Sequence, residues 1–441
     1  MIKILTGLIA LGLVVIIHEL GHFLAARLCG VVVETFSIGW GPVLLRKKIG
    51  KTEYRLSALP LGGYCGMKGE HAFTEALEKK LDSIPAEKGS FYGVHPFKRI
   101  LIAFAGPLAN LFFAVIVLSF VSAAGSNYES YSNKIVPASA YDGGTGSPVD
   151  EAGLIEGDRI ISLNNKKMDN YSDIQQFIVT HPQEKIQVVY EREGKTFTTT
   201  LIPNLDLKTG SGKIGIYPYV PLVVGAVKKG SAAEANGIKP GDRISAINGK
   251  SVSHFIQFNE YLKDKPEQVN ITIERNGLTV ESRLLILYSD KGLPESGINW
   301  KTETFIIPGT GFMASIESGF VETWKTLALT VKSIGLLFRG VDLSQAVSGP
   351  VRITMMIGEI AQTSITGVAQ LLSIICVSLF LMNLLPIPIL DGGLILFSLL
   401  EIISHKPLKQ KTMYYVQFIG IAFIGFMFIF ALFGDIRYLM K

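Results

Sequence analysis

Two histidines and a glutamate near the N-terminus have the spacing of a zinc hydrolase. The stretch Val15–Phe23 contains His18, Glu19 and His22 in the pattern His-Glu-x-x-His. On a helix, residues four apart share a face, so both imidazoles can bind one Zn²⁺ while Glu19 lies beside it as a general base. The alternative is the polar face of a soluble helix. The apolar residues on both sides oppose that reading, because ionisable groups at membrane depth are costly.

A carboxylate far along the chain could complete this site. Pro386 and Pro388 interrupt an apolar stretch just before Asp391, which is followed by two glycines. Alone, Asp391 would suit a cytoplasmic turn. Together with His18 and His22 it predicts a third zinc ligand, which leaves the fourth position open for water, as a catalytic zinc site requires.

Four apolar segments must position these residues. They are Ile4–Leu24, Ile100–Ser122, Gly367–Leu390 and Met413–Phe433. Each is near the roughly 20 residues needed to cross a hydrocarbon core. The loops after the first and third segments are rich in Lys and Arg, so the positive-inside rule predicts that both are cytoplasmic. The N-terminus, the soluble middle and the C-terminus then lie across the membrane.

Charge and cysteine content exclude several classes of protein. The net charge is +5, with no basic patch interleaved with aromatic residues, which speaks against nucleic-acid binding. The three cysteines, Cys29, Cys65 and Cys376, lie in or near the membrane segments, so no disulfide framework is expected. A cleaved signal peptide over residues 1–26 is also rejected, because its apolar core would contain the histidines and no Ala-x-Ala site follows it.

The residues after the first span have the pattern of a β-hairpin. From Val31 to Tyr64, β-branched and aromatic residues alternate with polar ones, and Gly and Pro punctuate them. We predict that this region, residues 31–70, re-enters the membrane beside the zinc helix. Non-helical backbone is tolerated there only against protein or a wet cavity. A cytoplasmic β-ribbon is the alternative.

An internal repeat divides the soluble middle. Residues Ser147–Ile160 align without gaps with Ser231–Ile244, and each copy continues into an apolar strand and an Asn turn. The pattern resembles PDZ domains, and the resemblance implies two inserted α+β domains, 126–215 and 216–306, of a fold that binds extended peptides at a sheet edge. A candidate carboxylate-binding turn, Ile214-Gly215-Ile216, precedes the second copy. The alternative is that both domains bind nothing and only occlude.

The remaining segments complete the predicted organisation. In the second span, Asn110 is expected to face the protein and bond a neighbouring helix. Residues Phe312–Phe338 are apolar at helical spacing with interspersed charges, which favours an interfacial helix over a span. The predicted order is 1–30 first transmembrane helix, 71–99 cytoplasmic linker with a surface helix, 100–125 second, 307–363 amphipathic surface helices, 364–393 third with Asp391, and 394–441 cytoplasmic loop and fourth helix.

Taken together, these motifs resemble the site-2 protease family of intramembrane zinc metalloproteases over essentially the whole chain. The motifs are His18–His22, Asn383–Gly393, Phe36–Pro42, Leu59–Tyr64 and the paired PDZ-like domains. The resemblance implies an α-helical polytopic membrane protein with four spans and a re-entrant β-element. It also implies one Zn²⁺ held by His18, His22 and Asp391, with Glu19 as the catalytic base. The substrate contacts that it implies are Asn383, Gly39, Trp40, Gly62, Gly63 and Tyr64.

The same resemblance implies regulated intramembrane proteolysis in an envelope stress response. The partners would be the lipid bilayer and single-span membrane proteins already trimmed outside the membrane, such as an anti-sigma factor, and remnant signal peptides. The location would be a bacterial inner membrane, with the active site near the cytoplasmic side and the PDZ-like domains periplasmic.

Two other classes of protein remain open. A metal transporter would need further polar residues along the spans, and an inactive scaffold would tolerate loss of Glu19.

Overall fold

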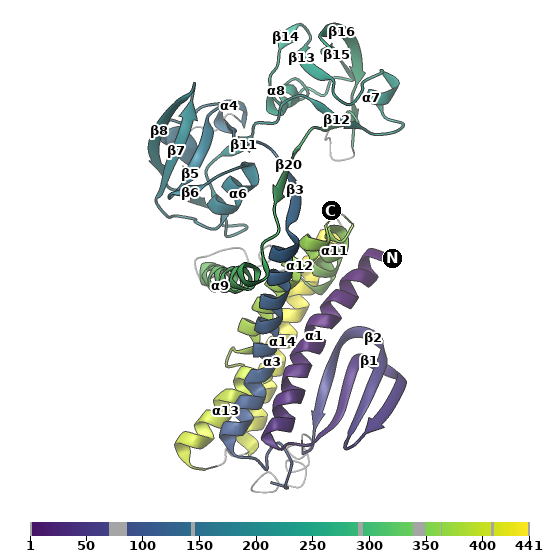
Figure 1. Cartoon of the computed structure of the whole chain (residues 1–441), viewed down its shortest axis with the longest axis vertical. Helices are drawn as coiled ribbons and strands as arrows, with labels where there is room; N and C mark the ends of the chain where they lie inside the picture. Colours follow the sequence, from purple (N-terminus) through teal and green to yellow (C-terminus); the bar gives the residue numbers. More distant parts are fainter. Residues whose placement is uncertain are drawn as a thin grey trace. The chain divides into compact units, whose positions relative to one another are not determined.

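The computed structural model describes residues 2–69, 86–142, 146–289, 294–337, 349–362, 364–406 and 410–439. Its internal contacts form two compact units. One consists of Met1–Ser126 and Pro308–Lys441, and the other of Asn127–Ile307 (Figure 1). Most of the predicted surface helix and linker between the first two spans lies outside the described residues.

Within the described ranges, four helices of the first unit are long and apolar enough to cross a membrane, which confirms the four predicted spans. They are α1 (Ile2–Cys29), α3 (Pro96–Ala124), α12 (Ile365–Asn383) and α14 (Gln410–Leu439). Val14, Ala114 and Val377 are buried where α1, α3 and α12 meet. A Cβ atom at Gly21 of α1 would collide with the carbonyl oxygen of Ala105 on α3. A glycine therefore permits the close crossing of the two helices.

The third predicted span is shorter than expected, and a helix after it was missed. The prediction placed one helix over 364–393 and a loop from 394 onward. Instead α12 ends at Asn383, and a separate helix, α13 (Asp391–Ser404), begins at the predicted metal ligand. Pro386 and Pro388 lack the amide hydrogen that a continuing helix needs. Beyond them, Gly392 and Gly393 lie so close to the backbone before α13 that neither could carry a side chain without a shift.

The predicted β region is a bent two-stranded ribbon that packs against α1. In β1 (Val33–Ile49) and β2 (Thr52–Met67), residue Thr35 pairs with both Gly66 and Glu53, so the start of β1 has partners on both sides. A Cβ atom at Gly12 of α1 would lie 2.5 Å from the carbonyl oxygen of Pro60. The ribbon at Pro60 therefore reaches α1 six residues before His18 in the sequence, and Figure 1 shows the ribbon beside α1.

Two further helices join the spans of this unit. The amphipathic helix α9 (Phe312–Leu337) packs against α3 and runs across the direction of the spans (Figure 1). Helix α11 (Pro350–Ile360) packs against α1. The buried carboxylate of Asp435 on α14 accepts hydrogen bonds from the backbone amides of Gly349 and Val351, at 3.0 and 2.9 Å, and so satisfies free donors at the start of α11.

The second unit holds two modules of similar construction, which we define as the first module (131–219) and the second module (220–301). Each has a four-stranded antiparallel sheet, in the orders β6-β5-β7-β8 and β14-β13-β15-β16. Each also has its own buried apolar core. The strands β3 (Ser126–Ser130) and β20 (Glu303–Ile307) pair with each other and connect the modules to the spans.

The elements of the first module are β4 (Ile135–Pro137), α4 (Ser139–Asp142), α5 (Pro148–Glu151), β5 (Arg159–Leu163), β6 (Lys166–Lys167), α6 (Tyr171–Val179), β7 (Ile186–Arg192), β8 (Lys195–Leu201), β9 (Asn204–Leu205), β10 (Gly212–Lys213) and β11 (Ile216–Pro218). Those of the second are β12 (Val224–Val227), α7 (Ala232–Ala235), β13 (Arg243–Ile247), β14 (Lys250–Ser251), α8 (Phe255–Glu260), β15 (Gln268–Arg275), β16 (Leu278–Leu285), β17 (Leu287–Tyr288), β18 (Pro294–Glu295) and β19 (Ile298–Trp300).

The repeated Gly-Asp-Arg-Ile motif holds each module together through the same ion pair. The buried carboxylate of Asp158 accepts two hydrogen bonds from Arg192 of β7, at 2.8 and 2.7 Å. Asp242 accepts two from Arg275 of β15, both at 2.6 Å. Such two-point pairs are strong and directional, so they fix the turn before β5 or β13 against the neighbouring strand.

The predicted boundary between the modules was wrong. We placed Ile214-Gly215-Ile216 before the second copy and began that copy at residue 216. Instead β11 pairs with β4, and Ile214 is buried in the core of the first module. The equivalent strand of the second module is β19, which pairs with β12. In each module, a strand that follows the repeated motif returns to pair with a strand that precedes the motif. The alignment of the motif alone could not locate this returning strand.

Candidate metal centre

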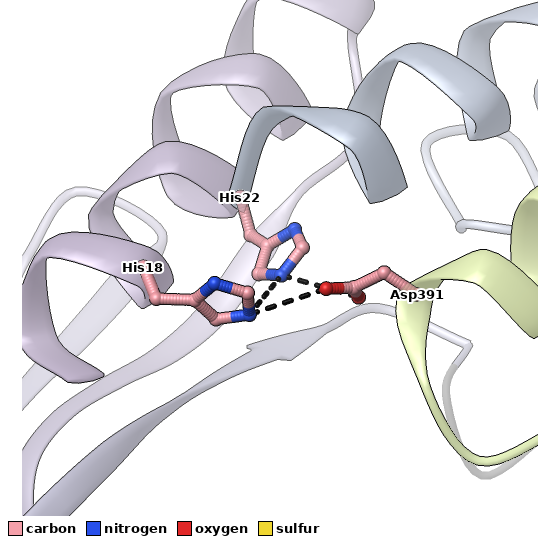
Figure 2. A group of neighbouring side chains, drawn as sticks. All are labelled: His18, His22 and Asp391. Atoms are coloured by element: carbon pink, nitrogen blue, oxygen red, sulfur yellow. Dashed lines mark hydrogen bonds and ion pairs between the residues drawn. The ribbon is translucent and has the colours of Figure 1, made fainter. Parts of the chain in front are cut away.

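Three side chains from two distant helices converge in the first unit. His18 and His22 lie one turn apart on α1, and Asp391 is the first residue of α13. Their Nε2 atoms are 3.2 Å apart, and the Asp391 carboxylate oxygens lie 3.2 Å from His18 Nε2 and 3.3 Å from His22 Nε2 (Figure 2). The closest approaches therefore link the three side chains pairwise at 3.2–3.3 Å, with a different oxygen of the Asp391 carboxylate facing each histidine.

These separations between neighbouring donors match the edge lengths of a zinc tetrahedron. Zinc–nitrogen and zinc–oxygen bonds of about 2.0–2.1 Å in tetrahedral geometry place neighbouring ligand atoms about 3.3 Å apart. Two imidazoles and one carboxylate also match the donor set of catalytic zinc sites, which keep a fourth position open. The donors and their spacing therefore fit Zn²⁺.

Glu19 lies beside the three ligands without joining them. It is absent from the group of ligand atoms that lie within 4.8 Å of one another. Its carboxylate bonds to the backbone of Cys65 in β2, and a Cβ atom at Gly63 would lie 3.8 Å from Glu19 Cγ. The edge of β2 thus runs past the carboxylate that the sequence predicts as the base.

Helix α3 contacts Nδ1 of each histidine ring, the nitrogen that faces away from the proposed metal position. His22 Nδ1 lies 2.8 Å from the carbonyl oxygen of Ile102, to which it can only donate. His18 Nδ1 lies 3.4 Å from the side-chain amide of Asn110, which is fully buried. When Nε2 binds a metal, Nδ1 carries the hydrogen, so the Asn110 oxygen is the matching partner. Among the described residues that oxygen has no hydrogen-bond partner while the amide nitrogen faces His18, and turning the amide by 180° would give it one.

A glycine of α3 leaves the space that both rings occupy. A Cβ atom at Gly106 would lie 2.5 Å from His22 Cε1 and 2.9 Å from His18 Cε1, and closer still to His22 Nε2. Sequence reasoning predicted only that Asn110 faces a neighbouring helix and assigned no part in the site to Gly106. The signal that could have identified both was their spacing, because residues four apart lie on one face of a helix.

The structure brings some of the predicted substrate contacts to this centre and leaves others away from it. Asn383 Nδ2, at the end of α12, lies 3.5 Å from His18 Nε2. Gly62 and Gly63 face α1, because a Cβ atom at Gly62 would lie 3.1 Å from Val15. The rings of Trp40 and Tyr64 contact each other with centroids 6.1 Å apart. Gly39 lies instead within the ribbon, against the carbonyl oxygens of Ser57 and Leu59.

The predicted peptide turn, which we assigned to the second copy, is tied to helix α6 of the first module. The hydroxyl of Tyr171, at the start of α6, donates to the carbonyl oxygen of Ile216 at 3.1 Å. Burial raises the pKa of Tyr171, so its hydroxyl remains a donor. In the second module, α8 begins instead with Phe255, and a cavity of about 530 Å³ is lined by Phe255, Gly297 and Lys228 among others. Sequence reasoning missed this cavity because it assigned the turn to the wrong module.

Comparison with known proteins gives a consistent result. The family profile described as "Peptidase family M50" matches residues 6–427. A protein of Treponema pallidum named "Putative zinc metalloprotease" is 48% identical, with 100% of both chains covered. One of the same name from Borreliella burgdorferi is 36% identical, with 99% of each chain covered. The Regulator of sigma E protease of Haemophilus influenzae is 28% identical over 97% of each chain.

Among solved structures, the PDZ domain of an SdrC-like protein from Listeria innocua is 27% identical. It covers 18% of this chain and 92% of its own, with a TM-score of 0.17 over the whole chain.

Proposed function

This chain belongs to peptidase family M50, the site-2 proteases, and on that premise we propose that it is an intramembrane endopeptidase that cleaves the membrane segment of single-span proteins. The observation that carries the proposal is the convergence of His18, His22 and Asp391 on helices of a membrane unit. A zinc metalloprotease with its ligands at membrane depth meets peptide bonds that are themselves in the membrane.

The proposed reaction assigns separate roles to the metal ligands and to Glu19. His18, His22 and Asp391 would hold one zinc per chain, which would supply an activated water and a Lewis acid for the scissile carbonyl. Glu19 accepts the proton from the attacking water and delivers it to the leaving amine. Its bond to the Cys65 backbone keeps the carboxylate beside β2, where a substrate strand would pass.

The peptide bonds of a substrate helix are hydrogen-bonded within that helix, so the helix must unwind locally before cleavage. We propose that the β1–β2 ribbon re-enters the membrane and receives the unwound segment, while the Asn383 amide holds it near the ligands. Trp40, Gly62, Gly63 and Tyr64 would face that segment. The contact of the Pro60 carbonyl with α1 at Gly12 supports this, since it places the bends of the ribbon alongside a membrane span.

The biological setting is proposed from the relatives. One of them is named Regulator of sigma E protease, which favours a bacterial inner-membrane enzyme acting on a trimmed anti-sigma factor, or on remnant signal peptides, in an envelope stress response. The basic loops after the first and third spans would be cytoplasmic, and the two modules periplasmic.

The decisive experiment measures cleavage of a single-span substrate in parallel with metal content. Glu19→Gln should keep about one zinc per chain and lose cleavage, because the ligands are untouched and the proton acceptor is gone. The matched control is Glu322→Gln, which removes an exposed carboxylate of α9 and should cleave normally. Normal cleavage by Glu19→Gln would refute the general-base assignment. Loss of cleavage with full zinc excludes a scaffold and a transporter.

The modules have a proposed role as a size filter, by which bulky ectodomains are rejected and trimmed ones pass. The alternative is a receptor for a newly exposed C-terminal carboxylate. The Tyr171–Ile216 bond ties α6 to β11, where a peptide strand would have to add, which disfavours this role for the first module and leaves the Gly297 cavity of the second as the candidate.

Replacing residues 132–301 with a short Gly-rich turn preserves the β3–β20 pair and separates the two roles. Cleavage of untrimmed substrate by this variant supports the filter. Loss of cleavage of trimmed substrate by a folded, zinc-loaded variant supports the receptor.

A further inference from the structure

One face of α3 contacts every element that carries a metal ligand. Arg99, Ile102, Gly106 and Asn110 follow at spacings of three and four residues, so they form one stripe along the helix, and all four are buried. As described above, Ile102 and Asn110 hold the two histidine rings and Gly106 leaves room for them. Arg99 is the remaining member of the stripe, and neither the proposed chemistry nor the sequence motifs assign it a role.

Arg99 makes a two-point ion pair with the helix that carries Asp391. Its Nη1 and Nη2 atoms donate to the two carboxylate oxygens of Glu401 on α13, at 3.0 and 2.9 Å. Arg99 is 8% exposed, and its guanidinium also lies over the ring of Tyr92, 5.8 Å from the centroid. Two parallel charge-assisted hydrogen bonds between largely buried side chains fix both distance and orientation, unlike a single exposed pair.

The connection between Asp391 and α12 is irregular. Asp391 begins α13 after the interruption between Asn383 and Leu390, and no side chain caps that helix start. Glu401 lies ten residues further on, about 15 Å along a helix that moves as one piece. Helix α13 packs against α3, so a slide of α13 along α3 would carry the Asp391 carboxylate away from the histidines.

We infer that Arg99 and Glu401 are positioning residues for the metal centre: their ion pair locks the Asp391 helix to α3 and thereby holds the third ligand against His18 and His22. The inference rests on the proposed zinc site. It concerns the geometry of that site and is independent of which peptide the enzyme cleaves.

The test measures metal binding to the full-length protein in detergent after its metal has been removed. The probe is Co²⁺, whose visible absorption reports the arrangement of its ligands, and chelator competition gives its affinity. Glu401→Gln keeps the volume and one acceptor but loses the charge. It should weaken Co²⁺ binding by roughly tenfold, near the lower limit for outer partners of metal ligands, and should change the absorption spectrum. Arg99→Glu should do the same.

The doubly reversed variant, Arg99→Glu with Glu401→Arg, should restore most of the affinity and the spectrum, which a general loss of stability cannot explain. Glu322→Gln on α9 is the control and should bind Co²⁺ like the wild type. Wild-type affinity and spectrum in a folded Glu401→Gln variant would overturn the inference while leaving the proposed function intact. So would failure of the reversed pair to restore binding. Absence of Co²⁺ and Zn²⁺ binding by the wild-type chain would instead refute the proposed function.

Discussion

The glycine that makes room for the two histidines gives the sharpest prediction, Gly106→Ala. The added methyl would lie 2.5 Å from His22 Cε1 and 2.9 Å from His18 Cε1, whereas an ordinary contact between such atoms is about 3.5 Å. The His22 ring must therefore retreat by about 1 Å or α3 must separate from α1. Metal–ligand distances tolerate deviations of only about 0.2 Å. The displacement therefore exceeds the tolerance of the site about fivefold.

We expect Gly106→Ala to reduce zinc affinity by roughly 100-fold, equivalent to about 2.7 kcal/mol, and to abolish cleavage. Zinc content of the purified protein and competition with a chromophoric chelator measure the loss. Gly425→Ala on α14 is the matched control, because nothing lies within 4 Å of its Cβ position. If Gly106→Ala retains zinc with wild-type affinity, the two rings do not occupy the positions described, and the assignment of the metal centre fails with them.

Three further outcomes follow from contacts described above. Asn110→Leu should weaken zinc binding by roughly 10-fold or more, whereas Asn110→Asp, which still accepts from His18 Nδ1, should bind like the wild type in the same chelator competition. Arg192→Met should destabilise the first module by roughly 2–3 kcal/mol in denaturant unfolding, because a buried carboxylate loses its partner. Burial lowers the pKa of His254, which faces Glu156 at 2.9 Å, so the unfolded chain binds the proton more readily. The modules should lose stability as pH falls below about 6.5, and His254→Gln should flatten that dependence in thermal unfolding.

Features with a regular period could be predicted from the sequence. The four spans follow from apolar length, and the facing of His18 and His22 follows from helical spacing. The start of α13 at Asp391 could not be predicted. Two prolines and two glycines, which usually interrupt helices, lie next to it, and its apolar residues had been assigned to a span and a loop. Local sequence identifies where a helix breaks, but packing decides where the next one begins.

Contacts between segments distant in sequence were also beyond prediction. Asn110 has the pattern of an ordinary polar residue in a span, and only the crossing of α1 and α3 places its amide at His18. Likewise, the turn at Ile214 belongs to the first module because β11 returns to pair with β4, which precedes the repeated motif. A repeat alignment finds the shared motif, but it cannot show which flanking strand closes which copy.

The order of the metal ligands along the chain bears on how the enzyme is made. His18 and His22 lie in α1, which is synthesised before both modules, whereas Asp391 follows both modules and α12. Under the proposed topology and function, a nascent chain that has inserted α1 and α3 and exported its modules would still lack its third ligand. It would then have no complete metal centre, and would not cut neighbouring membrane proteins at the insertion site, until α13 has docked. Proteolytic activity would thus begin only after the modules are in place.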